Sequence, residues 1–282
     1  MIGIIGGTGL YKIEELTNVE TLEVNTPFGL PSAPLTVGRW GDKKVAFLPR
    51  HGDSHQLLPS EINFRANIWA LKVSGVRQVF SVSAVGSLEK EIRPGELALP
   101  NQYIDFTKGI RERTFFGKGL VAHASTAEPV CSYLSSMTRK TAEAVSSHRV
   151  HSEKTYACVE GPRLGTRAES FHLQGAGAHL VGMTNVPEVF LAREAQLCYC
   201  TVAVITDYDC WLDDPAEHAS VDKVIELYRK NIGRVQEILK STIQKLDAND
   251  GCTCRHSLKF SLLTQESSLS EENKTILEVL RR

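Results

Sequence analysis

A nearly continuous run of nine apolar residues, LCYCTVAVI at 197–205, constrains the fold of this chain more than any other segment. Such a run is typical of a strand that is buried on both faces of a sheet. Segments with helical periodicity lie between this and other apolar runs, and that alternation indicates the α/β class. The further predicted strands are the first ten residues, which run into a glycine turn, then 43–49, 76–83, 156–159 and 180–183. The predicted helices are 60–75, capped by Ser60, then 187–196, 220–246 and a short one at 270–280.

Length and composition predict the domain organisation. The chain has 282 residues, of which 42% are hydrophobic, and this is enough for one large domain with a sizeable core. We find no internal repeat and no domain linker in the sequence. We therefore expect a single domain over 1–246. The remainder, 247–282, is expected to be a tail with a Cys-x-Cys pair and a short helix that packs on the same domain.

Charge excludes several classes of partner. Lys and Arg number 32 against 33 Asp and Glu, so the net charge of −1 provides no field that would attract nucleic acid or an anionic membrane. No apolar run approaches the ~20 residues that span a bilayer. The N-terminus lacks the basic segment and cleavage site of a signal peptide. We expect a cytoplasmic protein.

The seven cysteines form no Cys-x-x-Cys pair, which excludes a zinc ribbon and a thioredoxin motif. Cys252 and Cys254 are too close in sequence for a zinc knuckle, and no second pair along the chain completes four ligands. We therefore expect no metal, and buried or idle thiols in a reducing compartment. A second hypothesis is that Cys252 and Cys254 bond to each other or to another thiol, because a turn-like Asp-Gly precedes them.

Small or polar residues follow four of the predicted strands. In open α/β sheets the ligand lies beyond the carboxyl ends of the strands, so these four ends are expected to form one site. The ends are Gly7-Thr8, Arg50-His51, Ser83-Ala84 and Asp207-Tyr208-Asp209.

Each of these ends allows more than one interpretation. The glycines at 3–9 do not have the spacing of a dinucleotide-binding or Walker loop, so this turn is either an oxyanion cradle or only a tight turn. Arg50 and His51 form either an anion clamp or a surface Arg beside a structural His, while Gly52 argues against a helical metal site with His55. The absence of a Gly-x-Ser-x-Gly elbow argues against a serine hydrolase.

The acid pair Asp207 and Asp209 follows a wholly apolar strand, so both carboxyl groups are expected to be partly desolvated. Burial raises the pKa of a carboxyl group, which makes a protonated donor available near neutral pH. The alternative is a helix cap or a loop salt bridge. Because the pair converges with the other strand ends, we favour a functional role.

These segments together resemble the 5′-deoxy-5′-methylthioadenosine phosphorylases of the trimeric-type purine nucleoside phosphorylase superfamily. The resemblance implies one α/β domain with a mixed, partly barrel-like central sheet flanked by helices, assembled as a homotrimer or a dimer of trimers. It implies phosphorolysis of methylthioadenosine to adenine and 5-methylthioribose-1-phosphate, with inorganic phosphate as co-substrate and no metal or organic cofactor. The matching stretches are GIIGGTGL (3–10), TPFG (26–29), RHG (50–52), NFRANIWALK (63–72), SAVGSL (83–88), EGPR and RAES (160–170), MTNVPEV (183–189) and TDYDCW (206–211).

The resemblance also implies roles for individual residues. Met183 would lie under the ribose, Asp207 and Asp209 would meet the purine, and His123 would reach the thioether end of a neighbour's site. Further residues in contact with the nucleoside would be Gly86, Leu164 and Val221. Phosphate would contact Thr8, Arg50, His51, Ser83, Ala84 and Thr184.

The chemistry expected of such a site agrees with these roles. Cleavage of a glycosidic bond develops positive charge on the ribose and negative charge on the base, so a bound phosphate is both nucleophile and counter-ion. A protonated Asp207 can give its proton to purine N7. The alternatives are a broader purine nucleoside phosphorylase or a methylthioinosine phosphorylase, and more distantly a nucleoside- or NAD-binding protein without phosphorolysis.

Overall fold

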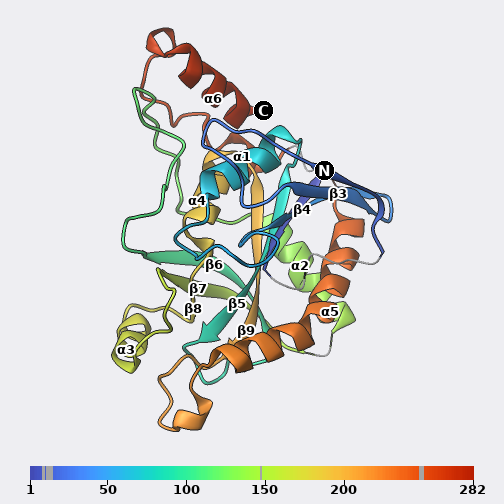
Figure 1. The fold of residues 1–282 in the computed structure, drawn as a ribbon, viewed down its shortest axis with the longest axis vertical. Helices are drawn as coiled ribbons and strands as arrows, with labels where there is room; N and C mark the ends of the chain where they lie inside the picture. Colours follow the sequence, from blue (N-terminus) through green and yellow to red (C-terminus); the bar gives the residue numbers. More distant parts are fainter. Residues whose placement is uncertain (8–9, 11–14, 147, 248–250) are drawn as a thin grey trace.

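A nine-stranded mixed sheet forms the centre of the molecule (Figure 1). The computed structural model describes residues 1–7, 10, 15–146, 148–247 and 251–282. The strands are β1 (Ile2–Gly6), β2 (Thr17–Leu22), β3 (Leu35–Trp40), β4 (Lys43–Pro49), β5 (Gln78–Ser87), β6 (Leu97–Phe106), β7 (Val150–Val159), β8 (Leu180–Gly182) and β9 (Cys198–Asp207). The helices are α1 (Phe64–Val73), α2 (Ser132–Val145), α3 (Arg167–Gly175), α4 (Asn185–Glu194), α5 (Val221–Lys245) and α6 (Glu271–Arg281), with short 3₁₀ turns at Pro215–Glu217, Thr253–His256 and Glu266–Ser268.

Part of the sheet closes on itself. The strand order is β2-β3-β4-β1-β5-β8-β7-β6-β9, and β9 also pairs with β5, so the last five strands form a ring. Strands β1, β4, β5 and β9 run parallel, whereas β8 is antiparallel to β5. The predicted class, a single α/β domain with a mixed and partly barrel-like sheet, is confirmed.

All ten residues of β9 are buried, which confirms the prediction from its apolar run. Its side chains alternate between two cores. Tyr199, Ala203 and Ile205 pack into the core that α1, α4 and α6 cover. Cys198 and Cys200 pack into the core that α2 and α5 cover. Strand β9 therefore separates the two cores and contributes side chains to both.

The structure corrects two boundaries. Helix α1 begins at Phe64, because the side chain of Asn63 accepts a hydrogen bond from the Ala66 backbone N–H and caps the helix in place of Ser60. Strand β5 does not end at Ser83 but continues to Ser87, so Ser83 and Ala84 lie within the strand.

The tail beyond residue 246 contacts the rest of the molecule. Leu277 and Leu280 of α6 belong to the same core as α1 and α4, and Figure 1 shows α6 beside α1. The side-chain amide of Gln196 donates to the Leu280 carbonyl and its oxygen accepts from the Leu258 N–H. Among the described residues, no helix is long and apolar enough to cross a membrane.

Candidate active site

Unequal strand lengths divide the candidate site into two groups of residues. Strands β1 and β4 end together, because Gly6 pairs with Pro49, while β5 and β9 continue until Gly86 pairs with Asp207. Arg50 follows β4 and donates to the carbonyl of Val82 on β5. Val82 and Gly86 are four residues apart, which is about 13 Å along a strand. One group therefore surrounds Arg50 and the other surrounds the acid pair.

The first group is a buried network around Arg50, whose side chain is 1% exposed. Its Nε donates to Glu188 Oε2 at 2.7 Å and its Nη2 donates to Glu188 Oε1 at 3.0 Å. Its Nη1 donates to the Val82 carbonyl at 3.0 Å and its Nη2 also donates to Ser81 Oγ at 2.6 Å. Burial lowers the pKa of Arg50, but the adjacent Glu188 carboxylate outweighs burial and the net shift is upward.

This geometry limits the part that Arg50 can take in binding phosphate. Sequence reasoning assigned its planar fork to a phosphate, but the fork grips the carboxylate of Glu188, which is fully buried. Four of the five guanidinium N–H groups are used inside the protein, and one Nη1 hydrogen remains. A direct contact of Arg50 with phosphate through that hydrogen stays a prediction.

Helix α4 supplies the other members of the network, which the sequence analysis did not identify. Glu188 Oε1 also accepts from Ser81 Oγ at 2.6 Å and from the Tyr199 hydroxyl at 2.8 Å. Asn185 Nδ2 donates to Ser81 Oγ and to the Tyr199 hydroxyl. The signal was available in MTNVPEV, where Asn185 and Glu188 stand three residues apart at the start of a predicted helix.

Two predicted phosphate residues adjoin this network. Ser83 Oγ donates to Asn185 Oδ1 at 3.3 Å. Thr184 is buried and is the N-cap of α4, yet its side chain makes no capping hydrogen bond. The structure thus brings Ser83 and Thr184 to the same place as Arg50, with the partly buried Ala84 next to Ser83. Thr8 lies outside the described residues.

His51 is a neutral side chain at this site. Its Nδ1 lies 2.9 Å from the Leu57 carbonyl, which can only accept, so the ring proton is on Nδ1 and Nε2 is an acceptor. Burial lowers the pKa of His51 to about 4. The ring stacks on His55 with a centroid distance of 4.3 Å. At neutral pH His51 therefore adds no positive charge to an anion clamp.

The second group contains the acid pair at the end of β9. Asp207 and Asp209 are 9% and 7% exposed, and burial raises the pKa of both carboxyl groups. Asp207 Oδ1 accepts from the Asp209 backbone N–H at 2.7 Å. Asp209 Oδ2 accepts from the hydroxyl of Ser170 on α3 at 2.5 Å. The predicted partial desolvation of this pair is present in the structure.

Thr206 shows where a proton on Asp207 can reside. Its hydroxyl oxygen is 2.7 Å from Asp207 Oδ2 and 3.2 Å from the Val85 carbonyl. A threonine hydroxyl has one hydrogen to donate. When that hydrogen points to the Val85 carbonyl, the short contact with Oδ2 requires a proton on Asp207. The geometry therefore accommodates both protonation states of Asp207.

Gly86 is necessary for the position of the acid pair. A Cβ atom at Gly86 would approach Asp207 Oδ1 to 2.8 Å and Asp209 Cβ to 3.3 Å. Ser170 is held by α3, which opens with a capping box between Thr166 and Glu169. The RAES stretch lies in this helix, but the sequence analysis predicted neither the helix nor a role for Ser170.

Arg111, a residue that sequence reasoning missed, positions Met183. Its Nε donates to Glu160 Oε1 at 2.6 Å and its Nη1 donates to the Met183 carbonyl at 2.8 Å. Met183 Sδ packs onto Gly161, where a Cβ would come within 2.5 Å of it. Gly161 also has a φ of +68°, so both space and conformation require glycine.

The remaining predicted residues lie at the surface of the described chain. Leu164 is 39% exposed and precedes Gly165, whose carbonyl accepts from the Cys210 thiol beside Asp209. Val221 is exposed at the start of α5, two residues after Ala219, which donates its N–H to the Asp209 carbonyl. His123 is exposed and its N–H donates to the Ser261 carbonyl of the tail. Contacts of these three with a nucleoside stay predictions.

Comparisons with known proteins place this fold and site in a family. A sequence profile described as the Phosphorylase superfamily matches residues 1–244. The chain is 42% identical to an S-methyl-5′-thioadenosine phosphorylase of Geobacter sulfurreducens over 280 residues, which are 99% of this chain and 97% of that protein. It is 46% identical to a protein of the same name from Hyperthermus butylicus, over 93% of this chain and 95% of the relative.

Solved structures agree with the sequence comparisons. A crystal structure of methylthioadenosine phosphorylase from an antarctic soil metagenomic library matches with a TM-score of 0.92 at 41% identity, over 99% of this chain and 98% of the other. Methylthioadenosine phosphorylase from Schistosoma mansoni, in complex with adenine, matches with a TM-score of 0.83 at 36% identity, over 100% of this chain and 98% of that one. Fold and profile together define a member of the phosphorylase superfamily. Within that superfamily, the chain belongs to the S-methyl-5′-thioadenosine phosphorylases, which confirms the resemblance that its motifs indicated.

Proposed function

We propose that this protein is a pentosyltransferase that cleaves 5′-methylthioadenosine with inorganic phosphate, giving adenine and 5-methylthioribose-1-phosphate. The observation that carries this function is the buried acid pair Asp207 and Asp209, about 13 Å along β5 from the Arg50 network. That separation accommodates a nucleoside with its base at the acid pair and phosphate under its ribose. The reaction needs no metal or organic cofactor, because phosphate itself is the nucleophile.

At the phosphate end, binding rests on hydrogen bonds and not on a net positive charge. The positive charge of Arg50 is balanced by Glu188, and His51 is uncharged at neutral pH. The proposed contacts are the hydroxyls of Ser83 and Thr184, the backbone N–H of Ala84 and the remaining Nη1 hydrogen of Arg50. Hydrogen bonds of this kind, fixed in a dry site, hold the phosphate under C1′, where its negative charge stabilises the positive charge that develops on the ribose.

At the base end, the two carboxyl groups have different roles. Asp207, protonated and in contact with Thr206, gives its proton to purine N7 and makes adenine a better leaving group. Asp209, oriented by Ser170, accepts the hydrogens of the adenine 6-amino group. A 6-oxopurine presents a carbonyl oxygen there, and an ionised carboxylate repels it. This arrangement favours adenine over hypoxanthine.

Substrate preference tests the proposal. Base release is measured with and without phosphate from methylthioadenosine, adenosine and inosine. We expect strictly phosphate-dependent turnover and a kcat/KM for methylthioadenosine that exceeds that for inosine by several orders of magnitude, because a buried polar mismatch discriminates strongly. Equal efficiency on inosine would reject the assignment of the acid pair. Ligand binding without turnover would instead indicate a nucleoside-binding protein.

We also propose that the chain assembles as a homotrimer or a dimer of trimers and acts in the cytoplasm. Val121, Phe260 and Leu263 are large apolar residues that are exposed near His123, since Ala122 bridges to Leu262 and His123 bonds to Ser261. If a neighbouring subunit packs on this surface, His123 comes close to the nucleoside site of that neighbour. Light scattering of the purified protein tests this, and a monomer at all concentrations would contradict it. Seven free thiols suit a reducing compartment.

A further inference from the structure

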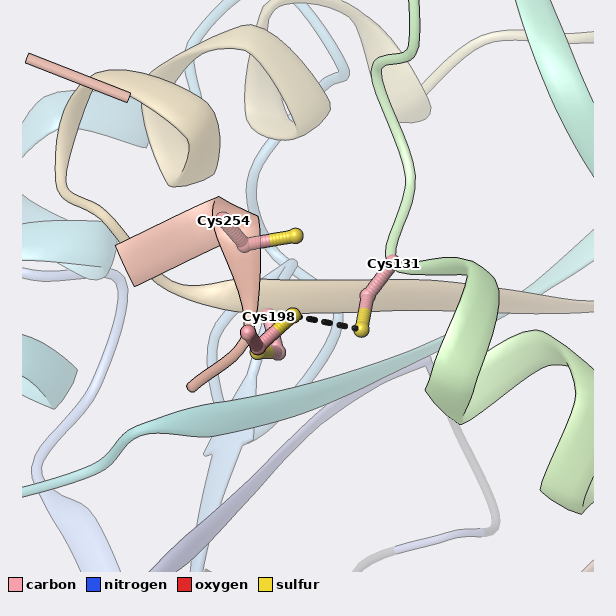
Figure 2. A group of neighbouring side chains, drawn as sticks. Cys131, Cys198 and Cys254 are labelled. Carbon is pink, nitrogen blue, oxygen red and sulfur yellow. Dashed lines mark hydrogen bonds between the residues drawn. The ribbon is translucent and has the colours of Figure 1, made fainter. Parts of the chain in front are cut away.

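Four cysteines from three separate parts of the chain meet at one point, on the side of β9 that faces α2 and α5. Cys131 is the N-cap of α2, Cys198 is the first residue of β9, and Cys252 and Cys254 belong to the tail. Their sulfur atoms all lie within 4.8 Å of one another. Figure 2 shows Cys131, Cys198 and Cys254 brought close together from three different segments.

The spacing of the sulfurs suits a metal ion. In a tetrahedral site with Zn–S bonds of about 2.3 Å, neighbouring sulfurs are roughly 3.8 Å apart. The sulfurs of Cys131 and Cys252 are 3.7 Å apart. A disulfide would need a separation of about 2.05 Å. All seven cysteines are free thiols, so the structure does not support the hypothesised bond of Cys252 and Cys254 with each other or with another thiol.

We propose that Cys131, Cys198, Cys252 and Cys254 form a structural tetrathiolate site for Zn²⁺. On binding, four thiols release four protons to solvent and four thiolates coordinate the ion, with no change of oxidation state. Thiolate ligands select a soft or borderline ion such as Zn²⁺. With four protein ligands the coordination sphere is closed, so the ion would hold the chain together and not act on the substrate.

The surroundings of the cluster favour such a site. Cys131, Cys198 and Cys254 are almost completely buried, and Cys252 is partly buried. Two ligands are fixed by backbone hydrogen bonds, from the Cys131 N–H to the Tyr199 carbonyl at 2.8 Å and from the Cys198 N–H to the Arg77 carbonyl at 3.0 Å. Cys131 stands at the N-terminus of the fourteen-residue helix α2, whose dipole stabilises a thiolate.

The site is separate from the candidate active site. Cys198 and Tyr199 are neighbours on β9 and point into different cores. Tyr199 bonds to Glu188 in the Arg50 network, whereas Cys198 joins the cysteine cluster. We expected no metal because the sequence has no Cys-x-x-Cys pair, and Cys252 with Cys254 supplies only two ligands. Folding supplies the other two ligands, Cys131 and Cys198, which are 67 residues apart in the sequence. A search for closely spaced cysteine pairs cannot find such a set of ligands.

The test uses the full-length protein, kept reduced with a phosphine in metal-free buffer. Bound zinc is removed under denaturing conditions, the chain is refolded, and Zn²⁺ or Co²⁺ is titrated back. We expect one ion per chain, with the thiolate-to-cobalt charge-transfer band and the intense visible bands of a tetrahedral Co²⁺ complex. Zinc is also measured directly in the protein as purified, so the result does not depend on refolding.

Cys252→Ala is expected to lower the Zn²⁺ affinity by at least tenfold and to abolish the tetrathiolate Co²⁺ spectrum. Cys200→Ala is the matched control, because Cys200 is a buried cysteine on the same strand but outside the cluster, and it should keep both. Two results would overturn the proposal. One is reduced wild-type protein that contains no zinc and takes up neither ion. The other is a chain purified under air-free conditions in which these cysteines are joined as disulfides.

Discussion

Arg50 shows how burial changes what a charged residue does. Always charged and suited to planar anions, it was expected to face a ligand, yet its carboxylate partner Glu188 lies 138 residues further along the chain. A pairing over that distance leaves no trace in local sequence pattern. The position of Arg50 at the end of a strand could be predicted from the sequence, whereas its buried partner Glu188 could be identified only from the fold.

We predict that Arg50→Ala lowers the free energy of unfolding by about 3–5 kcal/mol, because Glu188 is left buried without its counter-charge. Denaturant unfolding measures this. The double variant Arg50→Met with Glu188→Leu removes both charges, so it should recover most of the lost stability and still show a raised KM for phosphate. An Arg50→Ala protein that unfolds at the wild-type denaturant concentration would show that the ion pair is unimportant.

Asp207 carries the second prediction at this scale. Asp207→Asn keeps the size of the side chain but removes the transferable proton, so kcat for methylthioadenosine should fall roughly 10²–10⁴-fold. The loss should be much smaller for a nucleoside whose base leaves without protonation, and this substrate is the internal control. Equal losses on both substrates would mean that Asp207 positions the base and does not protonate it.

Among the elements, β5 and β9 define the candidate site because they extend beyond the ends of β1 and β4. The apolar runs of β1, β4, β8 and β9 predicted those strands closely. Strand β2 was missed because all six of its residues are exposed and carry no apolar pattern. Helix α3 was missed because only Ser170 and Leu173 of it are buried. An amphipathic pattern in the sequence indicates which residues are buried. An element that buries few residues, such as α3, therefore leaves no such pattern even when it holds a candidate site residue.

The close packing of β5 against β9 gives a prediction about Gly86. Gly86→Ala should displace Asp207, since the new Cβ would lie 2.8 Å from Asp207 Oδ1. A displacement of this kind can cost about 10²-fold in kcat/KM while the chain stays folded. Gly233→Ala in α5 is the control, because its Cβ meets no atom within 4 Å, and it should keep wild-type activity. Unchanged kinetics in Gly86→Ala would show that the acid pair adapts freely.

For the molecule as a whole, stability should depend on pH through Glu194. Burial raises the pKa of this carboxyl group to about 7, although it accepts hydrogen bonds from the Phe115 N–H and the Thr114 hydroxyl. Because the folded chain holds this proton more tightly than the unfolded chain, the stabilisation is complete below pH 4.5. It is lost progressively as the pH rises to about 7.

We therefore predict that Glu194→Gln flattens this part of the stability curve. The wild-type protein should lose up to about 3 kcal/mol between these pH values that the variant does not lose. Urea unfolding of both proteins at several pH values measures the difference. Glu128→Gln, an exposed position, should leave the wild-type curve unchanged. Parallel curves for wild type and Glu194→Gln would contradict the shifted pKa.

The pairing of β5 with β9 also bears on aggregation. By closing five strands into a ring, it leaves the sheet with β2 as its open edge among the described strands. Open edges are templates for pairing with another chain. Strand β2 is short and rich in polar residues, and its register with β3 shifts between Thr17 and Glu20. A bulged, polar edge is poorly suited to pair with a second molecule. The β2 edge therefore gives a second folded molecule little opportunity to add a strand to this sheet.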